Sequence, residues 1–91
     1  MDKIHLVVAT SGETVLDCRA AYVNIPLPYG SLGIMGDHAP LLCALGKGVL
    51  RCSGEDGAAR VLVSGGVADV QHNEVTVLAS SAKLLTDDAE R

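Results

Sequence analysis

The sequence predicts an all-β domain, a flattened sandwich or barrel of short strands. Short runs rich in Val, Ile and Thr dominate the chain, and Gly, Pro, Asn and Asp interrupt them about every 8–12 residues. No helical period extends over 11 or more residues before residue 80. The length of 91 residues suits a single domain, and the 48% hydrophobic content excludes a disordered chain. The turn spacing predicts about nine strands.

The first part of the chain is predicted to hold three strands, at residues 3–9, 14–19 and 20–26. In the first of these strands, Ile4, Leu6 and Val8 share one face because side chains alternate along a strand. Pro26 and Pro28 then end regular pairing, since neither residue has an N–H to donate.

Glycines mark the next segment, residues 30–40. Gly30, Gly33 and Gly36 lie within seven residues and predict an irregular, tightly turned backbone. Residues 41–45 are predicted to form a compact buried run. Further strands are predicted at residues 49–53, 59–64, 67–71 and 74–79. The Gly65-Gly66 pair predicts a break or bulge between two of them.

The pattern changes at Ser80. Ser80 and Ser81 are predicted to cap a short helical turn that extends through Leu85, and residues 86–90 have the acidic start of a second helix. We therefore expect a β-sandwich domain at residues 1–80 and a short tail at residues 81–91.

Charge and hydropathy narrow the classes of partner. The formal net charge is −4 and there is no basic run, so binding to nucleic acid or to anionic lipid is not expected. The longest apolar run has five residues, far short of the ~20 needed to insert into a bilayer. The N-terminus lacks the charged and apolar regions of a secretory leader, so secretion is not expected.

Motifs for catalysis, cofactors or metals are missing from the sequence. Gly46-Lys47 is not followed by Ser or Thr, so it is not a phosphate-binding loop. The three Cys and three His residues are too scattered for a zinc site, and the cysteines fit small buried side chains better than a disulfide framework. His38 and Cys43 could form a thiolate pair, but no orienting acid is evident. We expect no catalytic residue, no metal and no cofactor.

Residues 30–42 (GSLGIMGDHAPLL) resemble a known signature, G-x-x-G-I-x-x-x-H-A-P-L. It is the signature of the epsilon subunit of bacterial F-type ATP synthase. Further blocks agree in order and spacing, at residues 5–10, 48–51, 63–70 and 73–79. The resemblance covers residues 4–82.

The resemblance implies a β-sandwich of about ten strands, which in the family precedes a two-helix hairpin that is missing from this sequence. It also implies a non-catalytic rotor subunit of the central stalk, peripheral to the cytoplasmic face of the bacterial inner membrane. In the family, this domain binds the gamma subunit and the polar loops of the c-subunit ring, and it couples proton-driven rotation to ATP synthesis. No inhibitory activity of the hairpin can be assigned to these 91 residues.

The resemblance also assigns two interfaces residue by residue. At the edge that faces the c-ring loops it places Tyr29, Gly30 and Ser31. Towards the gamma subunit it places Thr10, His38, Ala39, Pro40, Leu41, Leu42 and Cys43. Ser31 departs from the acidic residue common in the family, and Cys43 departs from the usual Thr.

Two alternatives remain open at this point. One is a small β-barrel enzyme or ligand binder in which His38, Cys43 and Asp37 converge. The other is a free-standing regulatory fragment that binds the same gamma surface. The gamma-binding hypothesis predicts an exposed apolar patch around residues 38–43, and that patch could also cause weak self-association of the isolated chain.

Overall fold

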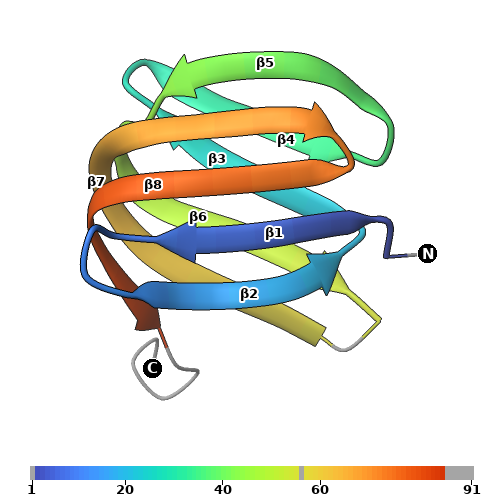
Figure 1. The fold of residues 1–91 in the computed structure, drawn as a ribbon, viewed down its shortest axis with the longest axis horizontal. Helices are drawn as coiled ribbons and strands as arrows, with labels where there is room; N and C mark the ends of the chain where they lie inside the picture. Colours follow the sequence, from blue (N-terminus) through green and yellow to red (C-terminus); the bar gives the residue numbers. More distant parts are fainter. Residues whose placement is uncertain (1, 56, 86–91) are drawn as a thin grey trace.

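The computed structural model describes residues 2–55 and 57–85, and it confirms the all-β fold class. The described residues contain no helix, and so none that could cross a lipid bilayer. They form eight strands (Figure 1): β1 Ile4–Ala9, β2 Thr14–Ala20, β3 Tyr22–Leu27, β4 Gly30–Met35, β5 His38–Ala44, β6 Lys47–Gly54, β7 Gly57–His72 and β8 Glu74–Leu85.

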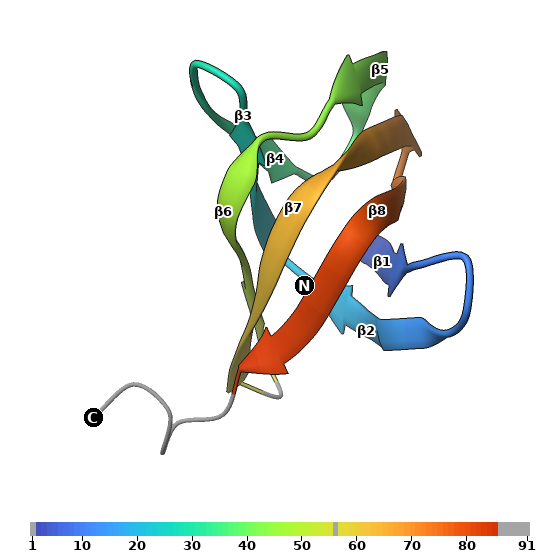
Figure 2. The same ribbon diagram turned by 90° about the vertical axis from the view of Figure 1, so that its left-hand side faces the viewer.

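The two longest strands, β7 and β8, belong to both layers of the sandwich. The strand order is β2-β1-β8-β7-β6-β3-β4, and β5 also pairs with β7. The second part of β7, residues 67–72, pairs with β5, whereas its first part, residues 57–64, pairs with β6. One layer therefore holds β5, β7, β8, β1 and β2, and the other holds β8, β7, β6, β3 and β4 (Figure 2).

Strand β7 passes from one layer to the other at Gly65 and Gly66. Both glycines have positive φ, 70° and 117°. The pairing between β7 and β8 nevertheless keeps one register from Arg60–Leu85 to Gln71–Glu74. The expected break or bulge at this point is therefore wrong, because the glycines bend the strand without an inserted residue. The strands predicted at residues 59–64 and 67–71 are therefore one strand, β7. The described residues form eight strands, where about nine were expected.

The helical turn expected at residues 80–85 is also wrong. Residues 81–85 continue β8 and pair with residues 60–64 of β7. The helix-capping pattern at Ser80 and Ser81 does not produce a helix here. Residues 60–64 of β7 offer hydrogen-bonding partners to the backbone along residues 81–85, so the strand continues. The helix start expected at residues 86–90 lies outside the described residues. Strand β8 crosses position 80, and the division into a domain at 1–80 and a tail at 81–91 stays a prediction.

Residues 30–45 differ most from expectation. Instead of an irregular segment, residues 30–35 form β4, which pairs with β3 from Tyr22–Met35 to Leu27–Gly30. A tight turn at Gly36-Asp37 leads into β5, where the register shifts between His38 and Leu41. The expected buried run at residues 41–45 is wrong, since only Leu45 is buried.

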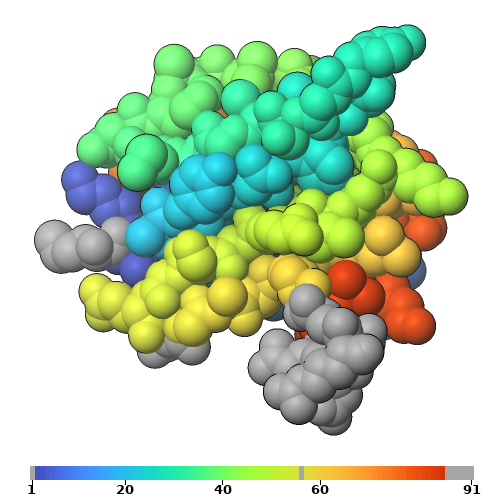
Figure 3. All heavy atoms as spheres, turned by 180° about the vertical axis from the view of Figure 1, so that it is seen from behind, coloured from blue at the N-terminus to red at the C-terminus, as the bar shows by residue number. Residues whose placement is uncertain are grey.

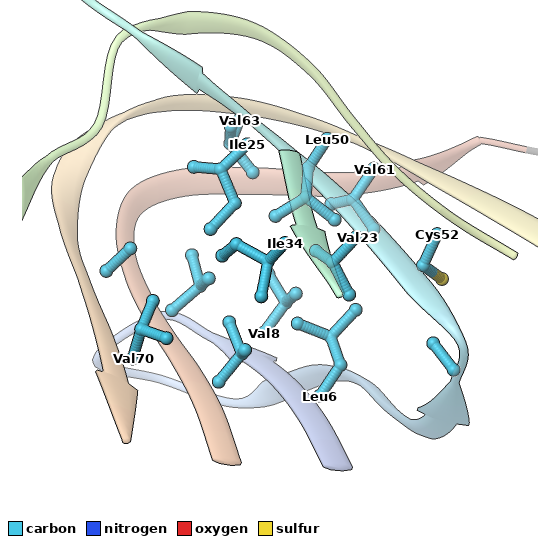
Figure 4. Close-up of a cluster of buried hydrophobic side chains, with 14 of the residues drawn as sticks. Leu6, Val8, Val23, Ile25, Ile34, Leu50, Cys52, Val61, Val63 and Val70 are labelled. Atoms are coloured by element: carbon cyan, nitrogen blue, oxygen red, sulfur yellow. The ribbon is translucent and has the colours of Figure 1, made fainter. Parts of the chain in front are cut away.

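The core lies between the layers and follows the predicted alternation of the strands. Ile4, Leu6 and Val8 are buried, as expected for one face of β1. Figure 4 shows aliphatic side chains from both layers packed against one another. The described residues bury no polar or charged residue. Fully buried large side chains include Ile25, Ile34, Leu50, Val23, Val61, Val63, Val70, Val75 and Val77.

Candidate functional site

Strand β5 carries most of the residues assigned to the gamma interface. Ala39, Pro40, Leu41 and Leu42 are all exposed, and Leu42 is 70% exposed. The predicted exposed apolar patch at residues 38–43 is confirmed. Because side chains alternate along a strand, the residues assigned to the gamma interface do not all face the same way. Leu42 faces outward and pairs with Asp69, whereas Cys43 is half-buried and packs against the core.

The patch continues across the outer face of the layer. Cross-strand register aligns Ala44 with Val67, Val67 with Leu78, and Leu78 with Ala9. Val67 and Leu78 are 43% and 51% exposed. Sequence reasoning missed these two residues, although both are large apolar side chains at outward positions of alternating strands. We call Leu42, Ala44, Val67 and Leu78 the outer apolar face.

Thr10 lies beside the outer apolar face, directly after Ala9. Its hydroxyl accepts a hydrogen bond from the Gly12 backbone N–H at 3.3 Å. A shallow hollow next to it is lined by Ser11, Gly66, Val67, Leu78, Ala79 and Ser80. Thr10 therefore lies at one end of the outer apolar face.

His38 lies at the opposite end of β5, where it pairs with His72. Its Nδ1–H donates to the Ala39 carbonyl at 2.7 Å. Cys43 lies five positions along β5 from His38, which is about 16 Å at the rise of an extended strand, so the two side chains do not converge. Burial raises the pKa of the Cys43 thiol, which disfavours a thiolate.

The Asp37 carboxylate is hydrogen-bonded to Lys3 and Asn73. Lys3 Nζ donates to its carboxylate at 3.1 Å, and Asn73 Nδ2 donates at 3.2 Å. These bonds, that of Lys3 first, lower the pKa of the Asp37 carboxyl. The geometry thus argues against the alternative of an enzyme built on His38, Cys43 and Asp37. Among residues 2–55 and 57–85, no three His, Cys, Asp or Glu side chains gather as metal ligands.

The three residues assigned to the c-ring interface lie at the tip of the β3–β4 hairpin. Leu27 pairs with Gly30, so Pro28 and Tyr29 form the connection. Tyr29 is fully exposed, Ser31 is exposed, and Gly30 has a φ of 148°. The hairpin protrudes from the body of the domain (Figure 3).

The hairpin is tied close to its tip to the segment that follows β5. The Gly46 backbone N–H donates to the Pro26 carbonyl at 2.9 Å, just after β5 ends. This hydrogen bond therefore links the hairpin tip to the segment after β5, the strand that carries part of the outer apolar face.

Comparison with known proteins identifies the family. Residues 3–85 match the family model described as "ATP synthase, Delta/Epsilon chain, beta-sandwich domain". The chain belongs to this family. An ATP synthase epsilon chain from a Synechococcus strain is 43% identical over 76 residues, which cover 84% of this chain and 56% of that protein. The epsilon chain of Symbiobacterium thermophilum is 41% identical over 85 residues, 92% of this chain and 61% of that protein.

Solved structures share the fold. In the cryo-EM structure of Euglena gracilis mitochondrial ATP synthase, one chain superimposes with a TM-score of 0.83 at 23% identity, covering 99% of this chain and 59% of that chain. A chain of the Tetrahymena thermophila mitochondrial ATP synthase central stalk and c-ring gives 0.71 at 17% identity, covering 89% and 66%. The chain thus spans less than two thirds of the length of the two curated relatives described above.

Proposed function

We propose that this chain acts as the β-sandwich part of a central-stalk subunit of F-type ATP synthase, a non-catalytic module that couples rotation of the c-ring to ATP synthesis. The family match over residues 3–85 carries the proposal. On this proposal the domain works at the cytoplasmic face of a bacterial inner membrane as a peripheral part of the complex.

The outer apolar face is the proposed surface for the gamma subunit. Leu42, Val67 and Leu78 expose large apolar side chains on neighbouring strands, although side chains of that kind are usually buried. Contiguous apolar surface on a soluble domain is typical of a partner site. Thr10 lies at one end of this surface and His38 at the far end of β5, so the proposed contact crosses the outer side of the layer from β5 to the end of β1.

The β3–β4 hairpin tip is the proposed contact with the polar loops of the c-ring. Tyr29 offers an aromatic ring and a hydroxyl at the most exposed point of the hairpin, and Gly30 and Ser31 expose backbone and hydroxyl groups beside it. Tyr is enriched at protein interfaces because it combines apolar area with a hydrogen-bonding end. Because the hairpin is anchored at Pro26, the tip can transmit torque to the rest of the domain.

Co-elution with the cognate gamma subunit on a sizing column tests the proposal. The wild-type chain should co-elute, and Leu42→Asp should weaken binding at least about tenfold by placing a charge in an apolar contact. Leu62→Asp is the matched control, since Leu62 is an exposed leucine of the other layer. Absence of co-elution by the wild type, or equal effects of the two variants, would overturn the proposed gamma surface. His38→Ala should weaken binding less than Leu42→Asp.

A second assay separates the two proposed contacts. Tyr29→Ala should bind isolated gamma as the wild type does but should lose capture by purified, detergent-solubilised c-ring from which gamma is absent. Loss of gamma binding by Tyr29→Ala would contradict the division of roles. Sedimentation of the isolated chain at rising concentration measures the weak self-association that the outer apolar face predicts.

A further inference from the structure

Two cysteines from opposite layers of the sandwich lie side by side. Cys18 of β2 and Cys52 of β6 are 34 residues apart in sequence, yet their Sγ atoms are 3.8 Å apart. Both are free thiols, Cys18 half-buried and Cys52 only 5% exposed. Figure 4 shows Cys52 at the border of the core cluster, far from Val70.

The path of the chain explains why the thiols meet. Strand β2 ends at Ala20 and β3 begins at Tyr22, so the chain turns from one layer into the other within two residues. At this corner the Ala21 backbone N–H donates to the Ser53 carbonyl at 2.8 Å. Val23 then pairs directly with Cys52. The backbone hydrogen bonds therefore hold β2 close to β6, and the inward-facing Cys18 reaches the Cys52 sulfur.

A surface hollow gives reagents access to this pair. Both cysteines line it, together with Asp17, Arg19, Ser53 and Ala58. The hollow lies at the β2 edge of its layer, whereas Cys43 lies on β5 at the opposite edge. A reaction at Cys18 and Cys52 would leave the outer apolar face untouched.

We propose that Cys18 and Cys52 form a redox-modification site, which a low-molecular-weight disulfide converts into an intramolecular disulfide between β2 and β6. The more accessible Cys18 thiolate attacks the reagent RSSR, forms a mixed disulfide and releases one RS⁻. The Cys52 thiolate then attacks the Cys18 sulfur and releases the second RS⁻. The two protons of the protein thiols yield two RSH, so two thiols are oxidised and one reagent disulfide is reduced.

The surroundings of the pair make this reaction slow and strongly dependent on pH. Burial, and after it the neighbouring Cys52, raises the pKa of the Cys18 thiol to about 12. The attacking thiolate is therefore scarce at neutral pH, and oxidation should accelerate as the pH rises. The linked form should in turn resist reduction, because thiols of high pKa are poor leaving groups.

Loop-closure statistics provide a sharp control. In an unfolded chain the shortest loop closes most readily, so Cys43 and Cys52, nine residues apart, should pair first. The folded chain should instead link Cys18 to Cys52, whose loop is the longest of the three. The identity of the linked pair thus reports the tertiary structure.

The experiment equilibrates the full chain with oxidised and reduced glutathione, alkylates remaining thiols and maps tryptic peptides. Trypsin places the three cysteines in different peptides, residues 4–19, 20–47 and 52–60. We expect the first and third peptides to be linked, Cys43 to be alkylated, and the unfolding temperature to rise by at least about 4 °C. Cys43→Ala should form the same link, whereas Cys18→Ala and Cys52→Ala should not.

Three results would overturn the proposal. They are alkylation of all three cysteines after equilibration with excess oxidised glutathione, a native link that contains Cys43, and the same pair of linked peptides from native and guanidinium-unfolded chains. None of these outcomes bears on binding to gamma, so this site and the proposed function fail independently.

Discussion

Asn73 holds Asp37 through two hydrogen bonds. The Asp37 backbone N–H donates to Asn73 Oδ1 at 2.6 Å, and Asn73 Nδ2 donates to Asp37 Oδ1 at 3.2 Å. Asp37 has a φ of 63°, a left-handed conformation that costs energy for a residue with a side chain. The Asn73 side chain therefore ties the turn between β4 and β5 to the turn between β7 and β8.

Asn73→Ala should lower the free energy of unfolding by about 1–2 kcal/mol, because the strained turn loses both bonds. Urea unfolding followed by circular dichroism measures the change. Gln71→Ala is the matched control, since Gln71 is exposed and, among the residues that the structure describes, its amide donates to Asp69 two residues away on the same strand. Equal losses in the two variants would show that the Asn73 side chain does not hold the turn.

His5 makes stability depend on pH. Its Nε2 lies 2.7 Å from Asp17 Oδ1 and its Nδ1 lies 3.2 Å from Glu74 Oε1, so the ring joins β1 to both neighbouring strands. The hydrogen bond with Asp17, more than any other interaction, raises the pKa of His5 above 6.5. A raised folded pKa means that the stabilisation is complete below the unfolded pKa and is lost as the pH rises through the folded pKa.

Melting curves between pH values of about 5.5 and 8.5 test this dependence. The wild-type melting temperature should fall across this range more than that of His5→Gln. Ring-proton titration by NMR should place the His5 midpoint above the ordinary value. Parallel melting profiles of the two proteins would contradict the role of His5.

Gly66→Ala should be strongly destabilising. A Cβ at Gly66 would overlap the Leu78 carbonyl oxygen, and the φ of 117° already disfavours any side chain. Gly57 has a similar φ of 113° but nothing within 4 Å of its added Cβ. Gly57→Ala therefore measures the cost of the backbone conformation alone. We expect Gly66→Ala to lose at least about 2 kcal/mol more than Gly57→Ala in chemical unfolding; a smaller difference would mean that the crossing of β7 relaxes without cost.

A pair of leucine variants separates the core from the proposed interface. Leu50 is fully buried, so Leu50→Ala should cost about 2–5 kcal/mol through lost burial and the cavity left behind. Leu42→Ala should cost less than about 1 kcal/mol, because its side chain is mostly exposed. Thermal unfolding of both variants measures the difference. A large loss for Leu42→Ala would assign Leu42 to the fold rather than to a partner surface.

Local patterns predicted the faces of strands well and their extents poorly. The alternation of Ile4, Leu6 and Val8 is sufficient to define the buried face of β1, since side-chain direction follows from backbone geometry alone. The helical turn predicted from Ser80 and Ser81 does not form, because a capping pattern depends only on residues that are neighbours in sequence. The pairing partner of Ser81, Ser64, lies 17 residues earlier and decides that the strand continues.

The residues assigned to the gamma and c-ring interfaces also show that sequence alone does not reveal which distant segments lie together. Tyr29, Gly30 and Ser31 are adjacent in sequence and lie together at one hairpin tip. Thr10 and His38 were assigned to one surface, but the structure sets them at opposite ends of a layer. Val67 and Leu78 complete the outer apolar face only through their pairing with one another, which the pattern of either strand alone does not reveal.

The amino-acid order alone therefore determined the all-β class, the inward positions of the strands and the family signature, because each depends on spacing along the chain. Tertiary structure decided the exposure of Leu42, the bend of β7 at Gly66 and the meeting of Cys18 with Cys52. These features depend on which distant backbone groups satisfy one another, and that choice is made only when the two layers close over the core.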